Sequence, residues 1–428
     1  MRKSAALKFS PAVAVLSLVL STFLAGCGGG DSTPDDDGGF GAAPAGVATL
    51  PQVAITTENG ARIDSKDEDR IGTLAITDAA GTPLYSGPME VHGRGNYTWD
   101  LPKKPYKVKL DDKTALLGMP SNKHWVLLAN YTDKTLMRND LAFALSEAMG
   151  MAWTPRSRFV ELTVNGSYDG VYQLTEHVRV DKNRVDIPEL DVDDTSAPKV
   201  TGGYLIEVDE RRGADFCFVT TRGGITMCPE SPEDLGDDAR KAQRDYIVQH
   251  LAAVEESIYG AQFTDPALGY AAYLDVDSVV DYYLINELYK NVDGGMTLST
   301  FLYKQREGKL AFGPIWDFDV AIGNIDNRSA DNPEGWQIHA AAWFGRLFQD
   351  PAFDAKVRAR WAQLKSEGTL DGVFARIDAD AALLDSAQAR NFARWQILDK
   401  YVSPNRVVTG SYAGEVAAMK EWLRARIA

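Results

Sequence analysis

Three aspartates in the second half of the sequence have the residue type and spacing to bind a divalent cation and to accept a proton. Asp293 follows an apolar stripe at helical spacing over residues 276–289 and precedes two glycines, so it is expected on an exposed turn. Asp317 and Asp319 flank Phe318, and in an extended segment they would share one face. Two such carboxylates repel unless a cation joins them, and magnesium favours one or two carboxylates plus phosphate oxygens. The alternative interpretation is a solvated acidic turn or a structural calcium site.

A predicted hairpin would bring these aspartates together. Residues 300–304 and 309–315 alternate like strands around a turn at 306–308. Because an antiparallel hairpin returns the chain to where it began, Asp293 and Asp317 are expected to lie near each other. Asp293 would then orient or deprotonate a hydroxyl group beside a cation held by Asp317.

A glycine turn and a lysine strand in the first half of the sequence suit an anionic ligand. Gly93, Arg94 and Gly95 lie between two predicted strands, and closely spaced glycines let backbone N–H groups approach phosphate. On the next strand Lys107 and Lys109 alternate with apolar residues and therefore share the face opposite the core. The alternative interpretations are an ordinary tight turn and a solvated sheet face.

The N-terminal segment has the pattern of a bacterial lipoprotein signal. Residues 1–26 combine a basic start with an apolar stretch, and they end in small residues directly before Cys27, which resembles a lipobox. Cys27 would be acylated, and residues 27–48 would be a flexible linker because they are rich in glycine and aspartate. This predicts lipid anchorage at the cell envelope, with the outer membrane or periplasmic side favoured. An uncleaved anchor is the alternative.

The two remaining cysteines predict a disulfide. Export places the chain in an oxidising compartment, and Cys217 and Cys228 are then an even pair. The segment between them alternates like two short strands around residues 222–224, so the bridge would join the strands of a hairpin. Two buried free thiols are the alternative.

The composition of the chain excludes several classes of partner and site. The sequence has 428 residues with a hydrophobic share of 45%, enough for a large core. Its formal net charge of -15 argues against nucleic acid as a partner. Three cysteines exclude an all-cysteine zinc site, and the five histidines form no recognisable hydrolase or zinc motif.

The predicted elements divide the body into two regions. Strands dominate up to about residue 230, interrupted by a predicted helix over 135–149, whereas helices dominate beyond it. The fold class is therefore α+β, with a domain over residues 49–428 that has a strand-rich N-lobe at about 49–230 and a helical C-lobe at about 231–428. The helices are expected at 233–257, 276–289, 340–366, 370–398 and 414–428.

The order of these parts, from glycine turn and lysine strand to the two aspartate loops, is that of a protein-kinase-like fold. The sequence also resembles the spore-coat protein H (CotH) kinase family of atypical protein kinases. The resemblance covers most of residues 90–325 and is carried by blocks at Gly93–Trp99, Pro102–Leu110, Trp125–Asn139, Gly170–Glu176, Asn286–Asp293 and Pro314–Asp319.

The resemblance implies an atypical, two-lobed kinase fold and ATP-dependent phosphorylation of Ser or Thr hydroxyls on an exported or surface protein, with Mg2+ or Mn2+. By position, Asp293 looks like the catalytic aspartate and Asp317 like the metal-binding one. Asp319 would be a second metal ligand. The membrane would be a partner only through the N-terminal lipid.

The resemblance also implies a set of ATP-binding residues. Lys107 or Lys109 would hold the phosphates beside the glycine turn, and Glu176 with His177 would lie where the lobes join and the adenine packs.

The chain departs from ordinary protein kinases at two points. It has no His-Arg-Asp triplet before Asp293, and no asparagine follows at the position that binds a second metal, where Asp319 or Asn324 could substitute. The rival interpretation is therefore a non-catalytic surface binding protein or adhesin on the same fold, in which the aspartates hold a structural metal.

Overall fold

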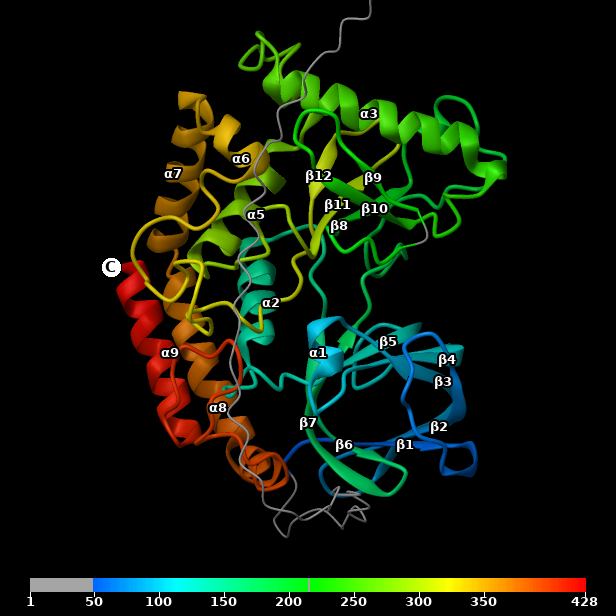
Figure 1. The fold of residues 1–428 in the computed structure, drawn as a ribbon, viewed down its shortest axis with the longest axis vertical. Helices are drawn as coiled ribbons and strands as arrows, with labels where there is room; N and C mark the ends of the chain where they lie inside the picture. The colour runs from blue at the N-terminus through cyan, green and yellow to red at the C-terminus, as the bar shows by residue number, and fades with distance from the viewer. Residues whose placement is uncertain (1–48, 215) are drawn as a thin grey trace, which may run out of the picture. The chain divides into compact units, whose positions relative to one another are not determined.

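The computed structural model describes residues 49–214 and 216–428. The predicted signal peptide, Cys27 and the linker to residue 48 lie outside these residues. The described part is a mixed α+β structure, which confirms the predicted α+β class (Figure 1).

The first half of the described chain forms a closed β-barrel, which the sequence did not predict. Its strand order is β1-β2-β3-β4-β5-β7-β6, and the parallel pairing of β1 with β6 closes it. Alternating residues fill its interior, so Tyr106, Val108 and Leu110 are buried on β4 while the lysines between them face outward. The strands are β1 (Gln52–Thr57), β2 (Arg70–Thr77), β3 (Pro83–Gly93), β4 (Tyr106–Thr114), β5 (Asn122–Leu128), β6 (Ser157–Val164) and β7 (Ser167–Glu176).

A second sheet joins segments that are far apart in the sequence. In its order β12-β11-β8-β10-β9, strand β8 pairs with both β10 and β11. This sheet therefore spans the lobe boundary that was expected near residue 230. The strands are β8 (Tyr204–Val208), β9 (Phe218–Val219), β10 (Thr226–Ser231), β11 (Thr300–Lys304) and β12 (Leu310–Phe312).

The predicted disulfide is present. Cys217 and Cys228 are bonded across the turn between β9 and β10, which pair in antiparallel fashion. The bridge therefore joins a hairpin, as the sequence predicted.

Removing this bridge is expected to lower the free energy of unfolding. The two cysteines are separated by 11 positions, and a loop of this size predicts a loss of about 3 kcal/mol in the double variant Cys217→Ser/Cys228→Ser. Urea unfolding under non-reducing conditions measures it. Dithiothreitol should destabilise the parent and leave the double variant unchanged, and equal midpoints for both proteins would contradict the expectation.

Most of the helices lie in the second half of the chain. The helix expected at 340–366 is two helices, because Asp350 caps a new helix that starts at Pro351. The helices are α1 (Tyr97–Asp100), α2 (Arg138–Met149), α3 (Lys241–Tyr259), α4 (Tyr270–Tyr273), α5 (Val276–Leu288), α6 (Ala342–Leu347), α7 (Pro351–Ser366), α8 (Thr369–Arg394) and α9 (Tyr412–Ile427), with short 3-10 turns at Glu58–Gly60, Lys199–Thr201 and Asp238–Arg240.

Two hydrophobic cores hold the structure together. One fills the barrel, and the other lies among the helices and the second sheet. Helix α8 packs against β7 of the barrel and against α2, so it connects the two parts (Figure 1). A buried ion pair of 2.7 Å between Glu161 on β6 and Arg390 on α8 reinforces that contact. Within residues 49–214 and 216–428, every helix is too short or too polar to cross a membrane.

Candidate active site

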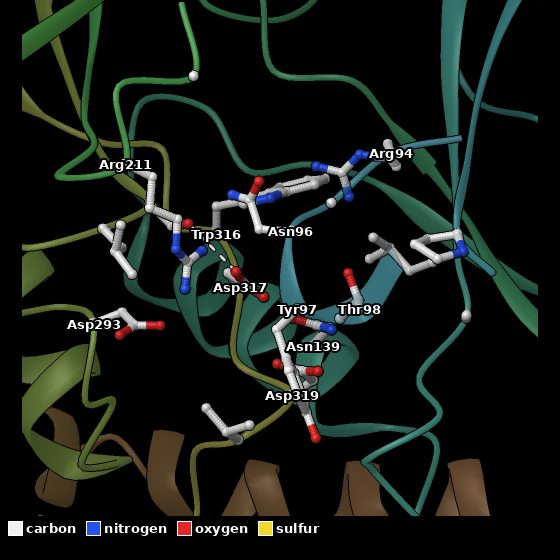
Figure 2. A pocket seen from close by; sticks show the side chains of 18 of the residues that line it. Arg94, Asn96, Tyr97, Thr98, Asn139, Arg211, Asp293, Trp316, Asp317 and Asp319 are labelled. Carbon is white, nitrogen blue, oxygen red and sulfur yellow. Dashed lines mark hydrogen bonds between the residues drawn. The ribbon is translucent and has the colours of Figure 1, made fainter. Parts of the chain in front are cut away.

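One cavity of about 660 Å³ is lined by residues from the barrel, the second sheet and the loops after α5 and β12 (Figure 2). Its size is within the usual range for sites that bind small molecules and nucleotides. Of the residues singled out in the sequence, those in its lining are Gly93, Arg94, Gly95, Lys107, His177, Asp293, Asp317 and Asp319.

The loop after α5 positions Asp293. The buried Asn291 accepts a hydrogen bond from the Asp293 backbone N–H at 3.2 Å, and its amide donates to the side chain of Asn286 at 3.1 Å and to the carbonyl of Asp317 at 3.3 Å. Asn291 therefore couples the end of α5 to both aspartate loops. The Asp293 side chain is 17% exposed.

Neighbouring polar groups fix the segment that carries Asp317 and Asp319. Asn139 on α2 accepts the Phe318 N–H at 2.7 Å, and the Thr132 hydroxyl donates to Asp319 Oδ2 at 2.8 Å. Phe318 points into the core, as expected. The expectation of an extended backbone is wrong, because Asp317 has a φ of 65° in the left-handed region. Both aspartates nevertheless line the cavity.

Burial gives the aspartates unusual titration behaviour. Burial, and then repulsion from Asp317, raises the pKa of Asp293 to about 6. The same two causes raise the pKa of Asp319 to about 8. Because packed carboxylates resist ionising together, a cation among them would be strongly favoured.

The donor set fits a magnesium or manganese ion that also binds phosphate. The oxygen atoms of Asp317 and Asp319 are the hard ligands that such ions prefer. Within the described residues, no three His, Cys, Asp or Glu side chains form a ready-made metal site. The remaining ligands would therefore come from phosphate and water.

The turn after β3 presents a side chain to the cavity. The N–H groups of Gly93 and Arg94 donate to the carbonyls of Ser65 and Pro105, so these two amides are already paired, and contact between phosphate and an N–H group of this turn stays a prediction for Gly95. The Arg94 guanidinium instead lies over the Trp316 ring, 5.5 Å from its centre. An added Cβ at Gly93 would lie 2.0 Å from the Trp99 ring, so any other residue here would force that ring to move.

The two lysines of β4 have different surroundings. Lys107 lies opposite His92 in the register of β3 and β4, next to the turn, and lines the cavity. Lys109 is two residues further along the strand, outside the lining, where it forms an ion pair of 2.8 Å with Glu90. The geometry therefore favours Lys107 for contact with an anion in the cavity.

Glu176 and His177, the two residues expected at the end of β7, also have different surroundings. Glu176 is buried outside the cavity lining, and its carboxylate accepts hydrogen bonds from the backbone and side chain of Arg156 at 3.0 and 2.8 Å. His177 lines the cavity, and its Nδ1 atom is buried without a hydrogen-bond partner. Burial lowers the pKa of His177 well below its usual value, so the ring is neutral. Its unpaired nitrogen suits a polar edge such as that of a nucleotide base.

Several residues of the cavity were not identified from the sequence. Glu207 on β8 and Glu230 on β10 line it, and burial followed by their mutual repulsion raises the pKa of Glu207 well above its usual value. Arg211 and Arg328 also line it, from loops that gave no sequence signal. Asn324 lies outside the lining, and both ends of its side chain are paired: the amide donates to the backbone carbonyls of Asp319 and Thr132 at 2.7 and 3.1 Å, and the oxygen accepts from Asn405 at 3.1 Å.

The barrel, the second sheet and the helices around this charged cavity define a mixed α+β protein with a site suited to an anionic ligand and a divalent cation. A family model described as CotH kinase protein matches residues 91–428, which is most of the chain. The chain therefore belongs to the CotH kinase family, and the resemblance stated from its motifs is confirmed. A comparison with curated proteins found no match. Family membership supports a kinase-like enzyme.

Proposed function

We propose that this protein is an atypical protein kinase that transfers the γ-phosphoryl group of ATP to Ser or Thr hydroxyls of an exported or surface protein. The observation that carries the proposal is that Asp293, Asp317 and Asp319 line one cavity with Arg94 and Lys107. Phosphoryl transfer depends on positioning and charge stabilisation, and this combination of carboxylates and cations supplies both.

Each residue has a role in the proposed reaction. Asp317 and Asp319 would hold Mg2+ or Mn2+, which neutralises charge on the phosphates, while Arg94 and Lys107 would contact phosphate oxygens. Asp293 would accept the proton of the acceptor hydroxyl while the oxygen of that hydroxyl bonds to the γ-phosphorus. The bond between that phosphorus and the bridging oxygen breaks, and ADP leaves.

The proposal extends to architecture and location. The barrel would act as the N-lobe of a two-lobed, kinase-like fold, and the helical part as its C-lobe. The disulfide supports export, because such bonds persist in oxidising compartments. Lipid attachment at Cys27, with the outer membrane or periplasmic side favoured, is part of the same proposal and is tested by mass spectrometry of the mature N-terminus.

The decisive experiment is a transfer assay with the purified full-length chain. We expect γ-labelled ATP with Mg2+ or Mn2+ to label a serine-containing peptide, and EDTA to prevent the labelling. A non-catalytic binding protein would bind nucleotide or metal without labelling the peptide. Absence of nucleotide affinity in titration calorimetry would refute the kinase proposal outright.

The raised pKa of Asp293 predicts a pH dependence of the rate. Only the ionised carboxylate accepts a proton, so kcat/KM for Mg-ATP should rise as pH increases through a pKa of about 6. Rates measured between about pH 5 and about pH 8 would show this rising limb of the pH profile. The value of kcat/KM is the appropriate measure because it reports the pKa of groups in the free enzyme. The limb should be missing in Asp293→Asn. A flat profile in the parent would argue against Asp293 as the base.

A further inference from the structure

The cations that line the cavity form an inner and an outer group. Arg94 and Lys107 are partly buried, next to the turn after β3. Arg211 and Arg328 are exposed, and both lie close enough to Asp293 to lower its pKa. Figure 2 shows the Arg211 side chain directed into the cavity on the side of Asp293 and Asp317. The outer pair, Arg211 and Arg328, therefore lies beside Asp293, which would receive the proton of the acceptor hydroxyl.

Both outer guanidinium groups are available to a ligand. Arg328 Nη1 is 3.7 Å from Asp293 Oδ1, and its side chain is 62% exposed, so this ion pair is weak and exchangeable. The Arg211 side chain has no hydrogen-bond or ion-pair partner within residues 49–214 and 216–428. Among the residues that the structure describes, no fold-stabilising contact depends on either guanidinium group.

The backbone at these positions is nevertheless fixed. Asp209 accepts hydrogen bonds from the N–H groups of Arg211 and Gly213 at 2.9 and 2.8 Å, which forms a tight turn after β8. Arg328 begins the segment 328–339, whose carbonyls of Ser329, Asn332 and Glu334 all accept hydrogen bonds from Lys290 Nζ at 2.8 Å. The two guanidinium groups are therefore presented from preorganised loops.

We propose that Arg211 and Arg328 select acceptors that carry an acidic residue next to the phosphorylated hydroxyl. This proposal rests on the kinase function proposed above and names its substrate class. A guanidinium group binds a carboxylate through two parallel N–H donors, which gives direction as well as affinity. The chain has a formal net charge of -15, so it repels an acidic acceptor over much of its surface. The positive pair Arg211 and Arg328 offsets this repulsion beside Asp293.

The competing role for these arginines is contact with the γ-phosphate of ATP. The two roles predict different kinetics. A contact with the acceptor changes kcat/KM for the acceptor according to its sequence and leaves the KM for ATP unchanged. A contact with ATP changes the KM for ATP equally with every acceptor.

The test compares three synthetic peptides with one central serine, flanked by glutamate, glutamine or lysine. The full-length parent should prefer the glutamate peptide over the lysine peptide by about tenfold or more in kcat/KM, and Arg211→Gln or Arg328→Gln should each remove most of that preference. Arg328→Lys should retain part of it, since charge remains without the paired donors. The matched control is Arg358→Gln, which removes an exposed guanidinium on α7 outside the cavity lining. Thermal unfolding confirms that every variant is folded.

The outcomes separate this proposal from the kinase function. Transfer that favours the lysine peptide, or a preference that both glutamine variants retain, overturns the acceptor selection alone. A common rise in the KM for ATP overturns it in favour of phosphate contact. Failure of the parent to label any of the three peptides refutes the kinase function and the acceptor selection together.

Discussion

Asp293→Asn is expected to lower kcat by about 10²- to 10⁴-fold while Mg-ATP still binds, because the amide fills the same space but cannot accept the proton. Asp317→Asn should abolish transfer in a different way, by removing a carboxylate ligand of the cation. The two substitutions therefore separate proton transfer from metal binding. Steady-state rates and calorimetric titrations with Mg-ATP measure both effects on the same protein samples.

The environment of the two aspartates supports this division. Asp293 is held by the side chain of Asn291, close to the exposed Arg328, where an acceptor can reach it. Asp317 receives a hydrogen bond of 3.3 Å from Ser299 and is next to the more deeply buried Asp319. Neither substitution changes side-chain volume appreciably, so the fold should persist.

The matched control for both variants is Asp371→Asn, an exposed aspartate in the first turn of α8. It should retain parental rates and affinity. An Asp293→Asn protein that keeps more than about a tenth of parental kcat would remove the case for a general base, since such groups contribute at least about 10²-fold. Tight Mg-ATP binding by Asp317→Asn would contradict its role as a ligand.

Local sequence patterns predicted many elements and the approach of the aspartates. The helix expected at 276–289 is α5 (Val276–Leu288), and the hairpin expected next is β11 with β12. These predictions depend only on side-chain periodicity and turn residues, which are local properties. The cavity that Asp293 and Asp317 share follows from the same hairpin geometry.

Features that depend on distant pairing were not predictable. Closure of the barrel requires Gln52–Ile55 on β1 to pair with Glu161–Val164 on β6, and nothing local to either strand specifies that partner. The choice between Lys107 and Lys109 is of the same kind, because both occupy the outward face of β4 and only tertiary structure decides which one reaches the cavity. Arg211 and Arg328 belong to irregular loops without a motif, so their approach to Asp293 could not be read from spacing.

The break at Asp350 and Pro351 is a different case, since its signal was present. An aspartate followed by proline is a common helix start, and here it begins α7, shortly after α6 has ended at Leu347. The prediction of one helix over 340–366 rested on helix-forming composition and did not use this signal.

The largest effect on stability is expected for Glu287→Gln at the end of α5. The Glu287 carboxylate is 4% exposed and accepts hydrogen bonds from the N–H groups of Gln337, Ile338 and His339 at 2.8 to 3.1 Å. It also pairs with Arg426 of α9 at 2.7 Å. Removing the charge leaves the largely buried Arg426 without the carboxylate that balances its own charge, and breaking such a pair costs about 3 to 5 kcal/mol.

Urea unfolding measures this loss as a lower midpoint, and Glu421→Gln is the matched control because Glu421 is exposed on the same helix as Arg426. An unchanged midpoint for Glu287→Gln would show that the buried pair does not stabilise the fold.

Lys290→Met extends the argument from stability to function. It removes the three hydrogen bonds that fix the segment starting at Arg328. If that segment positions Arg328 for the acceptor, Lys290→Met should raise the KM for the glutamate peptide while the KM for ATP stays at the parental value. A simple loss of folded protein would instead lower kcat for all peptides alike, because it reduces the concentration of active enzyme without changing either KM.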